Sequence, residues 1–398
     1  MSENQIKNSI STIKKVILKG PILTNTGYGV HTRQVFKALL SRSDIDLYVQ
    51  PTLWGNTSWI LDSEFDNGIV GEILKYCQKS KAGLIYDVSY QVLLPNEWTI
   101  IAKKNVGITA GFEADIVKTS WISICNKMDL VITPSDFTRN AFIKTSIENN
   151  INLKTEITVI NEWYYDLFDS KTYNDYFLEG LKFDKNILII GQITSNNESS
   201  DRKNMLKTIR TAAKFVEDKN IGIVLKVNMS NYSSSSFNDI KSTLNHEVSS
   251  NVLNKIAIIS GSLTIDELKS LYSHKKINCM LSGTRAEGWG LPFIESAYCG
   301  LPIIATNYSA YKEYLEDDFL GIDYDLVVFN QDNHFTDKNA KPYWADFNIE
   351  SMLFCLNEFF SNEEKYINKA NNRKILIKQS YNSSIIIEDY KKVFESNF

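Results

Sequence analysis

Cysteine is scarce in this 398-residue chain, and the few cysteines present follow no metal-binding spacing. They are Cys77, Cys125, Cys279, Cys299 and Cys355, and no two of them form a CxxC pair. Scattered single cysteines argue against both a disulfide framework and a cysteine-rich zinc site. We therefore expect reduced, buried thiols in a cytoplasmic protein.

Long apolar runs and an excess of positive charge are also missing. No apolar stretch approaches the 18 residues that a membrane-spanning helix needs, and we find no secretory pattern ahead of the first predicted strand. The formal net charge is −4, so no overall basic field is expected to recruit nucleic acid. The β-branched "KKVILKG" (14–20) favours a first strand, and an amphipathic helix on a membrane surface over "SISTIKKVILKG" (9–20) is the alternative. Peripheral contact with the inner membrane face therefore stays open.

Apolar and aromatic residues are plentiful, at 43% and 12% of the chain, which predicts a globular protein. Short β-branched runs alternate with helical stretches; "NILIIGQI" (186–193) is a continuous apolar strand of the kind buried in a parallel sheet. The alternation lies on both sides of a polar stretch near 169–185. It predicts an α/β protein of two Rossmann-like, doubly wound domains, 1–168 and 169–382, with a C-terminal helix at 383–398.

One sixteen-residue stretch, "EGWGLPFIESAYCGLP", begins at Glu287 and places a second glutamate, Glu295, eight residues later. It follows a predicted strand, and Pro292 suits the first position of a helix. Gly288 and Gly290 then lie in the strand-to-helix turn. A helix start offers free N–H groups and a partial positive charge, which suit a diphosphate. A first-turn glutamate that only complements the helix dipole is the simpler alternative for an isolated pair.

The whole stretch resembles the E-x7-E signature of the retaining glycosyltransferases of family four, which have the GT-B fold. The resemblance implies two domains facing a cleft, and a second glutamate, Glu295, that binds the donor ribose. It implies that the first glutamate, Glu287, faces the donor sugar. It also implies that backbone groups near the donor phosphates and sugar come from Gly290, Leu291, Pro292 and Phe293.

A second motif, "DRKNMLKTIRTAAKF", begins with the basic pair Arg202 and Lys203 after the strand at 186–193. Such a pair is suited to neutralise a departing diphosphate. Members of the family usually carry an arginine directly after this strand, and this chain has Gln192 there. We therefore expect Arg202 to supply that charge, with Gln192 near the donor; a solvated basic pair at a helix start is the alternative.

In the first half, "NTGYGVHTRQVF" resembles the glycine-rich first loop of the same family. Gly27 and Gly29 are expected to frame a turn beside the donor phosphates. The segment "GITAGFEADIV" resembles a T-x-x-x-E element of the family, here Thr109 and Glu113, but contains no histidine of the kind that relatives place near the donor sugar. Candidates on the acceptor side are Tyr28, His31, Thr109, Glu113 and Trp98, and Trp54 is a further aromatic that could stack on a sugar.

Two Asp-x-Asp triplets, at 44–46 and 323–325, match a metal-binding motif of GT-A glycosyltransferases. Neither lies beside the other motifs, and two doubly wound halves do not suit GT-A. We expect no catalytic metal and no cofactor besides the nucleotide-sugar co-substrate.

The resemblance implies a retaining, metal-independent hexosyltransferase that moves a sugar from a UDP- or GDP-sugar to an acceptor hydroxyl. The acceptor would be linked to a sugar, lipid or protein, and no nucleic acid is expected as a partner. A catalytically inactive sugar-nucleotide-binding protein and a GT-B epimerase or phosphorylase are the alternatives. The C-terminal helix has an apolar side, with Ile386, Tyr390 and Phe394, that must be buried. In GT-B proteins this helix crosses back to the first domain.

Overall fold

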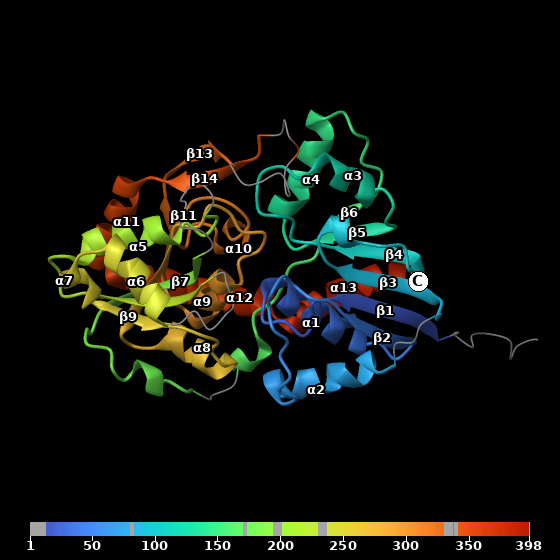
Figure 1. Ribbon diagram of the computed structural model, residues 1–398, viewed down its shortest axis with the longest axis horizontal. Coiled ribbons are helices and arrows are strands. Elements are labelled where there is room, and N and C mark those ends of the chain that lie inside the picture. The colour runs from blue at the N-terminus through green and yellow to red at the C-terminus, as the bar shows by residue number, and fades with distance from the viewer. Residues whose placement is uncertain are drawn as a thin grey trace, which may run out of the picture.

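The computed structural model describes residues 13–79, 83–169, 173–193, 201–229, 237–329, 337 and 341–397. Within these ranges the chain forms two α/β units that lie side by side (Figure 1). The first strand of the second unit, β7, is Asn186–Ile193, as its apolar sequence predicts. The last strand of the first unit ends at Val159, and the first strand of the second unit begins at Asn186. The predicted boundary at 168/169 lies between these two strands. The boundary residue itself stays a prediction.

The first unit contains six parallel strands in the order β2-β1-β3-β4-β5-β6. Its strands are β1 Lys14–Gly20, β2 Ile45–Pro51, β3 Tyr86–Val92, β4 Ala102–Ile108, β5 Leu130–Thr133 and β6 Ile157–Val159. Its helices are α1 Gly27–Leu40, α2 Phe65–Cys77, α3 Thr119–Cys125 and α4 Asp136–Glu148. Leu18 of β1 pairs with Val49 of β2 and Tyr90 of β3, and all three are buried. The neighbouring residue Ile17, which points to the opposite face, is buried as well, so the sheet is covered on both faces, which explains its apolar strands.

The second unit also contains six parallel strands, in the order β9-β8-β7-β10-β11-β12. The remaining strands are β8 Gly222–Met229, β9 Ile256–Ile259, β10 Ile277–Ser282, β11 Ile303–Thr306 and β12 Leu320–Ile322. Its helices include α5 Met205–Val216, α6 Phe237–Glu247, α7 Ser250–Leu253, α8 Ile265–Ser273, α9 Leu291–Cys299, α10 Lys312–Leu315 and α11 Ile349–Ser361. Counted from β7, this is the 3-2-1-4-5-6 order of a Rossmann fold.

A hairpin that the sequence pattern did not indicate follows β12. Its strands, β13 Tyr324–Val328 and β14 Tyr343–Phe347, pair antiparallel. Its end contacts the first unit, where Asp115 N donates to Tyr343 O at 3.2 Å. The hairpin therefore ties the two units together at one side of the molecule.

The last two helices cross from the second unit to the first. Helix α12, Glu363–Ser380, packs against α9, whereas α13, Ser383–Asn397, packs against α1 (Figure 1). Ile386, Tyr390 and Phe394 enter the apolar core of the first unit, and the ring centroids of Phe394 and Tyr90 lie 4.9 Å apart. The predicted return of the C-terminal helix is confirmed. Within the described ranges, no helix has the length and apolar character to cross a membrane.

Candidate functional site

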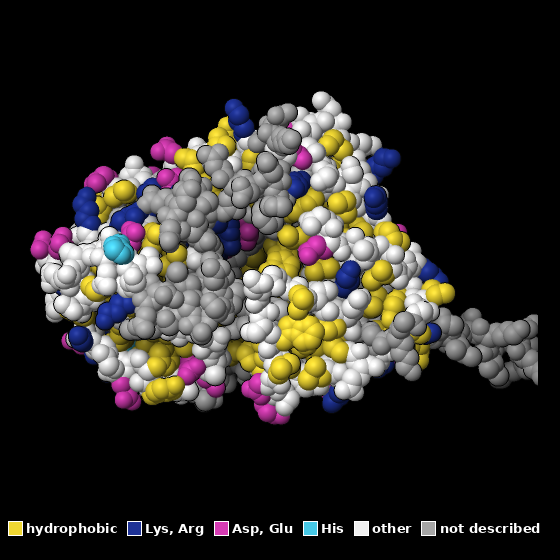
Figure 2. Space-filling model, in the orientation of Figure 1, with side chains coloured by type: hydrophobic (Ala, Val, Ile, Leu, Met, Phe, Trp, Pro, Cys, Tyr) yellow, Lys and Arg dark blue, Asp and Glu magenta, His cyan; other side chains and the backbone are white. Residues whose placement is uncertain are grey.

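Each of the two sheets has a topological switch point, where the connections that leave two neighbouring strands run in opposite directions. In the second sheet it lies between β7 and β10, and in the first between β1 and β3. Ligands of open α/β sheets bind outside the carboxyl ends of the strands at such points. A cavity of about 700 Å³ lies there, lined by segments that follow all four strands (Figure 2). That volume suits a small-molecule site.

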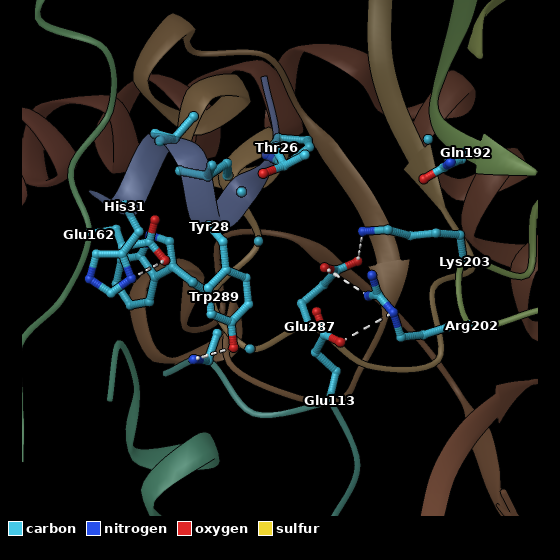
Figure 3. Close-up of a pocket in the computed structure, with 18 of the residues that line it drawn as sticks. Thr26, Tyr28, His31, Glu113, Glu162, Gln192, Arg202, Lys203, Glu287 and Trp289 are labelled. Atoms are coloured by element: carbon cyan, nitrogen blue, oxygen red, sulfur yellow. Dashed lines mark hydrogen bonds and ion pairs between the residues drawn. The ribbon is translucent and has the colours of Figure 1, made fainter. Parts of the chain in front are cut away.

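Glu287 is the electrostatic centre of the cavity. Its Oε1 accepts hydrogen bonds from Lys203 Nζ at 2.6 Å and Thr284 Oγ1 at 2.8 Å. Its Oε2 accepts one from Arg202 Nη1 at 3.2 Å (Figure 3). Burial alone would raise the pKa of Glu287, but Lys203 and Arg202 outweigh it and hold the pKa at about 2. The glutamate is therefore ionised and paired with both cations of the basic motif.

Two loops bring these charges together. Asp201 accepts a hydrogen bond from Met205 N at 2.8 Å and so fixes the start of α5 directly after the basic pair. Arg202 O accepts from Arg285 N at 2.9 Å, and Arg202 Nη1 donates to Ala286 O at 2.9 Å. The loop after β7 and the loop after β10 are thus bonded to each other, and the position of the cations relative to Glu287 is set by the backbone.

Glu295 lies one helical turn into α9 and is buried beside the same cavity. Its Oε2 accepts a hydrogen bond from the Tyr272 hydroxyl at 3.0 Å. Burial raises the pKa of Glu295 to about 8, although the bond from Tyr272 acts against the rise. A carboxyl group in this state can exchange hydrogen bonds with ligand hydroxyls.

The glycines of the loop between the two glutamates have different tasks. Gly290 is the N-cap of α9, with φ +93°, and has no side chain with which to bond the first N–H groups of the helix. Pro292 has no N–H and Phe293 N donates to Gly290 O at 2.9 Å, so the N–H that this helix start can offer a ligand is that of Leu291. A Cβ at Gly288 would lie 2.6 Å from Ala110 O, so Gly288 permits the close approach of the first unit. Helix α9 begins at Leu291, which makes Pro292 its second residue.

Tyr28 comes from the first turn of α1 and lies across the cavity from Glu287 (Figure 3). Its ring stacks on Trp54 with centroids 4.2 Å apart. Its hydroxyl bonds Thr109 Oγ1 at 2.9 Å and accepts from Ala110 N at 3.0 Å. The tyrosine is therefore held rigidly by the end of β4, and its stacked face with Trp54 forms an aromatic wall.

His31, Glu162 and Tyr390 form a buried row at the base of the cavity. His31 Nε2 bonds the Tyr390 hydroxyl at 3.0 Å, and His31 Nδ1 lies 3.7 Å from Glu162 Oε1 (Figure 3). Burial lowers the pKa of His31 to about 3, so the imidazole is neutral. Burial, and then the charge of Glu295, raise the pKa of Glu162 to about 8.

The two units are in direct contact around the cavity. Glu113 Oε2 of the first unit lies 3.4 Å from Arg202 Nε of the second. Gly288 O accepts hydrogen bonds from Ser135 Oγ at 2.7 Å and Thr138 Oγ1 at 3.3 Å. Burial, partly offset by Arg202, raises the pKa of Glu113. Arg202 is thus shared by carboxylates of both units.

The cavity brings together most of the residues predicted from the sequence. Those that line it are Glu287, Lys203, Arg202, Glu295, Gly290, Leu291, Pro292, Gly27, Gln192, Tyr28, His31, Glu113 and Trp54. Those that do not are Gly29, Phe293, Thr109 and Trp98.

Each residue outside the lining has a structural role. Gly29 lies in the first turn of α1, where its N donates to Thr26 Oγ1 and a Cβ would lie 2.1 Å from Thr24 O. Gly27 is the first residue of the same helix, so the two glycines do not frame a turn as predicted. Phe293 stacks on Tyr311 at 4.0 Å between centroids. Trp98 packs on Gly107 and donates to Gln91 O at 3.1 Å. Thr109 acts through Tyr28, as described above.

Sequence reasoning missed several residues of the lining, and among those with ionisable or aromatic side chains are Glu162, Lys226, Tyr272 and Trp289. Lys226 is a lysine within the apolar strand β8, and its Nζ donates to Gly261 O at 2.6 Å. Burial lowers its pKa to about 8. A charged residue inside an apolar strand was a readable signal. Tyr272 and Trp289 carried no signal besides their aromatic character.

The aspartates of the Asp-x-Asp triplets pair with other side chains of the protein. Asp44 pairs with Arg42, and Asp46 Oδ1 lies 2.6 Å from Lys79 Nζ. Asp323 Oδ2 accepts from Ser351 Oγ at 3.2 Å. In the part of the chain that the structure describes, no three His, Cys, Asp or Glu side chains gather as metal ligands would. The expectation of metal-independent chemistry stays a prediction.

Residues 240–338, which include both glutamates and α9, match the family model of the group 1 glycosyl transferases. This part of the chain is therefore similar to the group 1 glycosyl transferases. No curated protein matches the chain. Among solved structures, sucrose-phosphate synthase from Thermosynechococcus elongatus superposes with a TM-score of 0.63 at 12% identity, covering 96% of this chain and 98% of that one.

Two further solved structures show the same likeness. Anabaena HepE, solved with UDP and glucose, has a TM-score of 0.60 at 13% identity and covers 96% of this chain and 100% of its own. Trehalose 6-phosphate synthase from Burkholderia multivorans has a TM-score of 0.62 at 9% identity, covering 96% and 98%. At such identities the likeness concerns the fold. The fold is GT-B, which confirms the architecture predicted from the glycosyltransferase signature.

Proposed function

We propose that the protein is a retaining glycosyltransferase that moves a hexose from a UDP- or GDP-sugar to an acceptor hydroxyl. The observation that carries the proposal is the arrangement of Lys203, Arg202 and the open start of α9 around Glu287. A nucleotide diphosphate needs cations and free N–H groups together, and a sugar needs a fixed acceptor of hydroxyl hydrogen bonds. The cavity holds both within one wall.

The donor would lie along this wall with its diphosphate at the start of α9. Gly290 and Leu291 offer backbone groups, and Lys203 and Arg202 offer charge. In the structure without substrate both cations are paired with Glu287, so an incoming diphosphate takes over part of their pairing. Glu287 is then available to accept hydrogen bonds from the donor sugar, and Glu295 from the ribose.

The transfer breaks the bond between the anomeric carbon and the phosphate oxygen and forms a bond from that carbon to the acceptor oxygen on the same face. Negative charge develops on the departing diphosphate, where Lys203, Arg202 and the helix start stabilise it. The acceptor proton passes to a phosphate oxygen, so no side chain has to act as base. The ionised Glu287 stabilises positive charge on the sugar.

The acceptor would enter from the first unit, beside the aromatic wall of Tyr28 and Trp54. Paired aromatic faces bind the apolar face of a sugar ring well. An acceptor linked to a polysaccharide, a lipid or a protein is consistent with this wall, with transfer in the cytoplasm or at the inner membrane face.

A donor panel tests the proposal. Thermal shift is measured with UDP, GDP, ADP and their sugars, and UDP-glucose is included because HepE was solved with UDP and glucose. A ligand at 100 times its dissociation constant stabilises by about 2.7 kcal/mol. The stabilising sugar nucleotide is then incubated with the protein, and proton NMR follows the anomeric centre. Retained configuration in the product supports the proposal. Thermal stabilisation without bond cleavage would indicate a binding protein. A changed sugar that is still attached to the nucleotide would indicate an epimerase.

A further inference from the structure

Glu162 stands out among the residues around the cavity because half of its carboxylate has no partner. It follows β6 in the stretch that leads from the first sheet toward the second, and it is only 4% exposed. Oε1 faces His31 Nδ1 at 3.7 Å, whereas Oε2 is buried without a hydrogen-bond partner among the described residues. The side chain lines the cavity (Figure 3).

A buried carboxyl oxygen without a partner is costly, and native structures rarely keep one unless a ligand uses it. The surrounding contacts hold the group in place. Tyr390 of the C-terminal helix bonds His31 Nε2 at 3.0 Å, which fixes the imidazole that faces Oε1. His31 is neutral, so it does not compensate a charge on Glu162. Oε2 therefore keeps an acceptor capacity that no described residue uses.

The same cavity contains a second carboxyl that lies near Glu162. The charge of Glu295 acts on Glu162, which places the two groups within electrostatic reach. Glu295 comes from α9 of the second unit, whereas Glu162 precedes the crossing between the units. Glu295 Oε2 also accepts a hydrogen bond from the Tyr272 hydroxyl. The two carboxyl side chains, one from each unit, thus line the same cavity.

We infer that Glu162 and Glu295 together bind the two ribose hydroxyls of the donor nucleotide, one carboxyl to each. This inference rests on the proposed function, since Glu295 is the residue assigned there to the ribose. A vicinal diol has two donors at the spacing of adjacent hydroxyls, so it can bridge two carboxyl groups. Binding the nucleotide would then join the two units at their crossing, in addition to the contacts already present.

The test is a titration calorimetry comparison of UDP and GDP with their 2′,3′-dideoxy forms. The proteins are the wild type, Glu162→Gln, Glu162→Leu and Glu295→Gln, with Glu179→Gln at an exposed site as the matched control. Loss of a hydrogen bond to the ribose weakens binding by about 10-fold, so Glu162→Leu should bind the diphosphate that much more weakly. Glu179→Gln should bind as the wild type does.

The dideoxy forms separate ribose contact from a structural role. If Glu162 contacts the diol, removing the hydroxyls costs the wild type affinity but costs Glu162→Leu much less. Equal losses in the two proteins would overturn the inference and assign Glu162 to structure alone. Unchanged binding of UDP and GDP by Glu162→Leu would also overturn it while leaving the proposed function intact. If the wild type binds no nucleoside diphosphate at all, the proposed function and this inference both fail.

Discussion

Lys203 Nζ lies 2.6 Å from Glu287 Oε1, and the two residues come from loops that follow different strands of the second sheet. Arg202 bonds the other oxygen of the same carboxylate. The two cations proposed to bind the donor diphosphate are thus paired with a carboxylate of the protein itself. An internal counterion keeps the buried charges paired, and it also competes with the phosphates.

Changing this counterion should separate binding from transfer. Glu287→Gln keeps the size of the side chain but removes the charge, so Lys203 and Arg202 attract a diphosphate more strongly. We expect tighter binding of UDP or GDP by calorimetry and a steeper salt dependence. Transfer should fall at the same time, because the carboxylate that faces the sugar is lost. Weaker diphosphate binding in Glu287→Gln would contradict the assigned competition.

The buried carboxyl Glu162 should make stability depend on pH. Its pKa is raised from 4.5 to about 8 in the folded protein, so the folded state holds the proton more tightly than the unfolded chain. The resulting stabilisation is complete below pH 4.5 and is lost as the pH rises through about 8. Glu162→Gln cannot ionise, whereas Glu295 remains in both proteins.

Melting temperatures of the wild type and Glu162→Gln, measured in steps across that window, check this dependence. The wild type should lose more on going from acid to alkaline buffer than the variant does. His31 stays neutral throughout, since its pKa is about 3, and does not add to the difference. Parallel curves would show that Glu162 does not gain its proton on folding.

The packing of the C-terminal helix on the first unit can be tested by a single side-chain substitution. Phe394 is fully buried against Tyr90, so Phe394→Ala should lower the free energy of unfolding by about 3–5 kcal/mol. Ile385 lies on the same helix and is 40% exposed, so Ile385→Ala should change it by about 0.5 kcal/mol or less. Urea unfolding measures both, and UDP or GDP affinity should be the same in the two variants. Equal unfolding energies would place the helix elsewhere.

Metal removal should leave the reaction intact. Lys203, Arg202 and the start of α9 supply the positive field that a divalent ion supplies in other glycosyltransferases. Release of the nucleoside diphosphate is therefore expected at the same rate before and after treatment with EDTA. A loss of activity that Mn²⁺ restores would show that a metal ion stabilises the leaving group. Its candidate ligands would then be Asp44 and Asp46, or Asp323 and Asp325.

Much of the fold was readable because the strands are buried on both faces, as "NILIIGQI" of β7 illustrates. The burial of α13 followed from its apolar face, and its return to the first unit followed from the resemblance to GT-B proteins. Helix α2 was not anticipated, since Asp66, Asn67 and Gly68 at its start have non-helical, positive φ angles. The hairpin β13–β14 was missed too, because its pairing spans residues far apart in the chain.

At the site, motifs led to the charged residues, which chemistry restricts to few types. They did not lead to Glu162, because its meaning depends on His31 and Tyr390, which are distant in sequence and meet it only after α13 docks. Aromatic residues were the least predictable: Trp98 is buried against Gly107, whereas Trp54 reaches the cavity. Spacing alone does not distinguish these two outcomes.

The most direct measurement is the rate at which the wild type and Lys203→Met release nucleoside diphosphate from the sugar nucleotide that binds. Methionine keeps the unbranched apolar side chain but removes the charge that stabilises the leaving group. The account predicts release by the wild type and a fall on the order of 100-fold in Lys203→Met. Undiminished release by a folded Lys203→Met, or none by the wild type with any nucleotide sugar and acceptor, would contradict it.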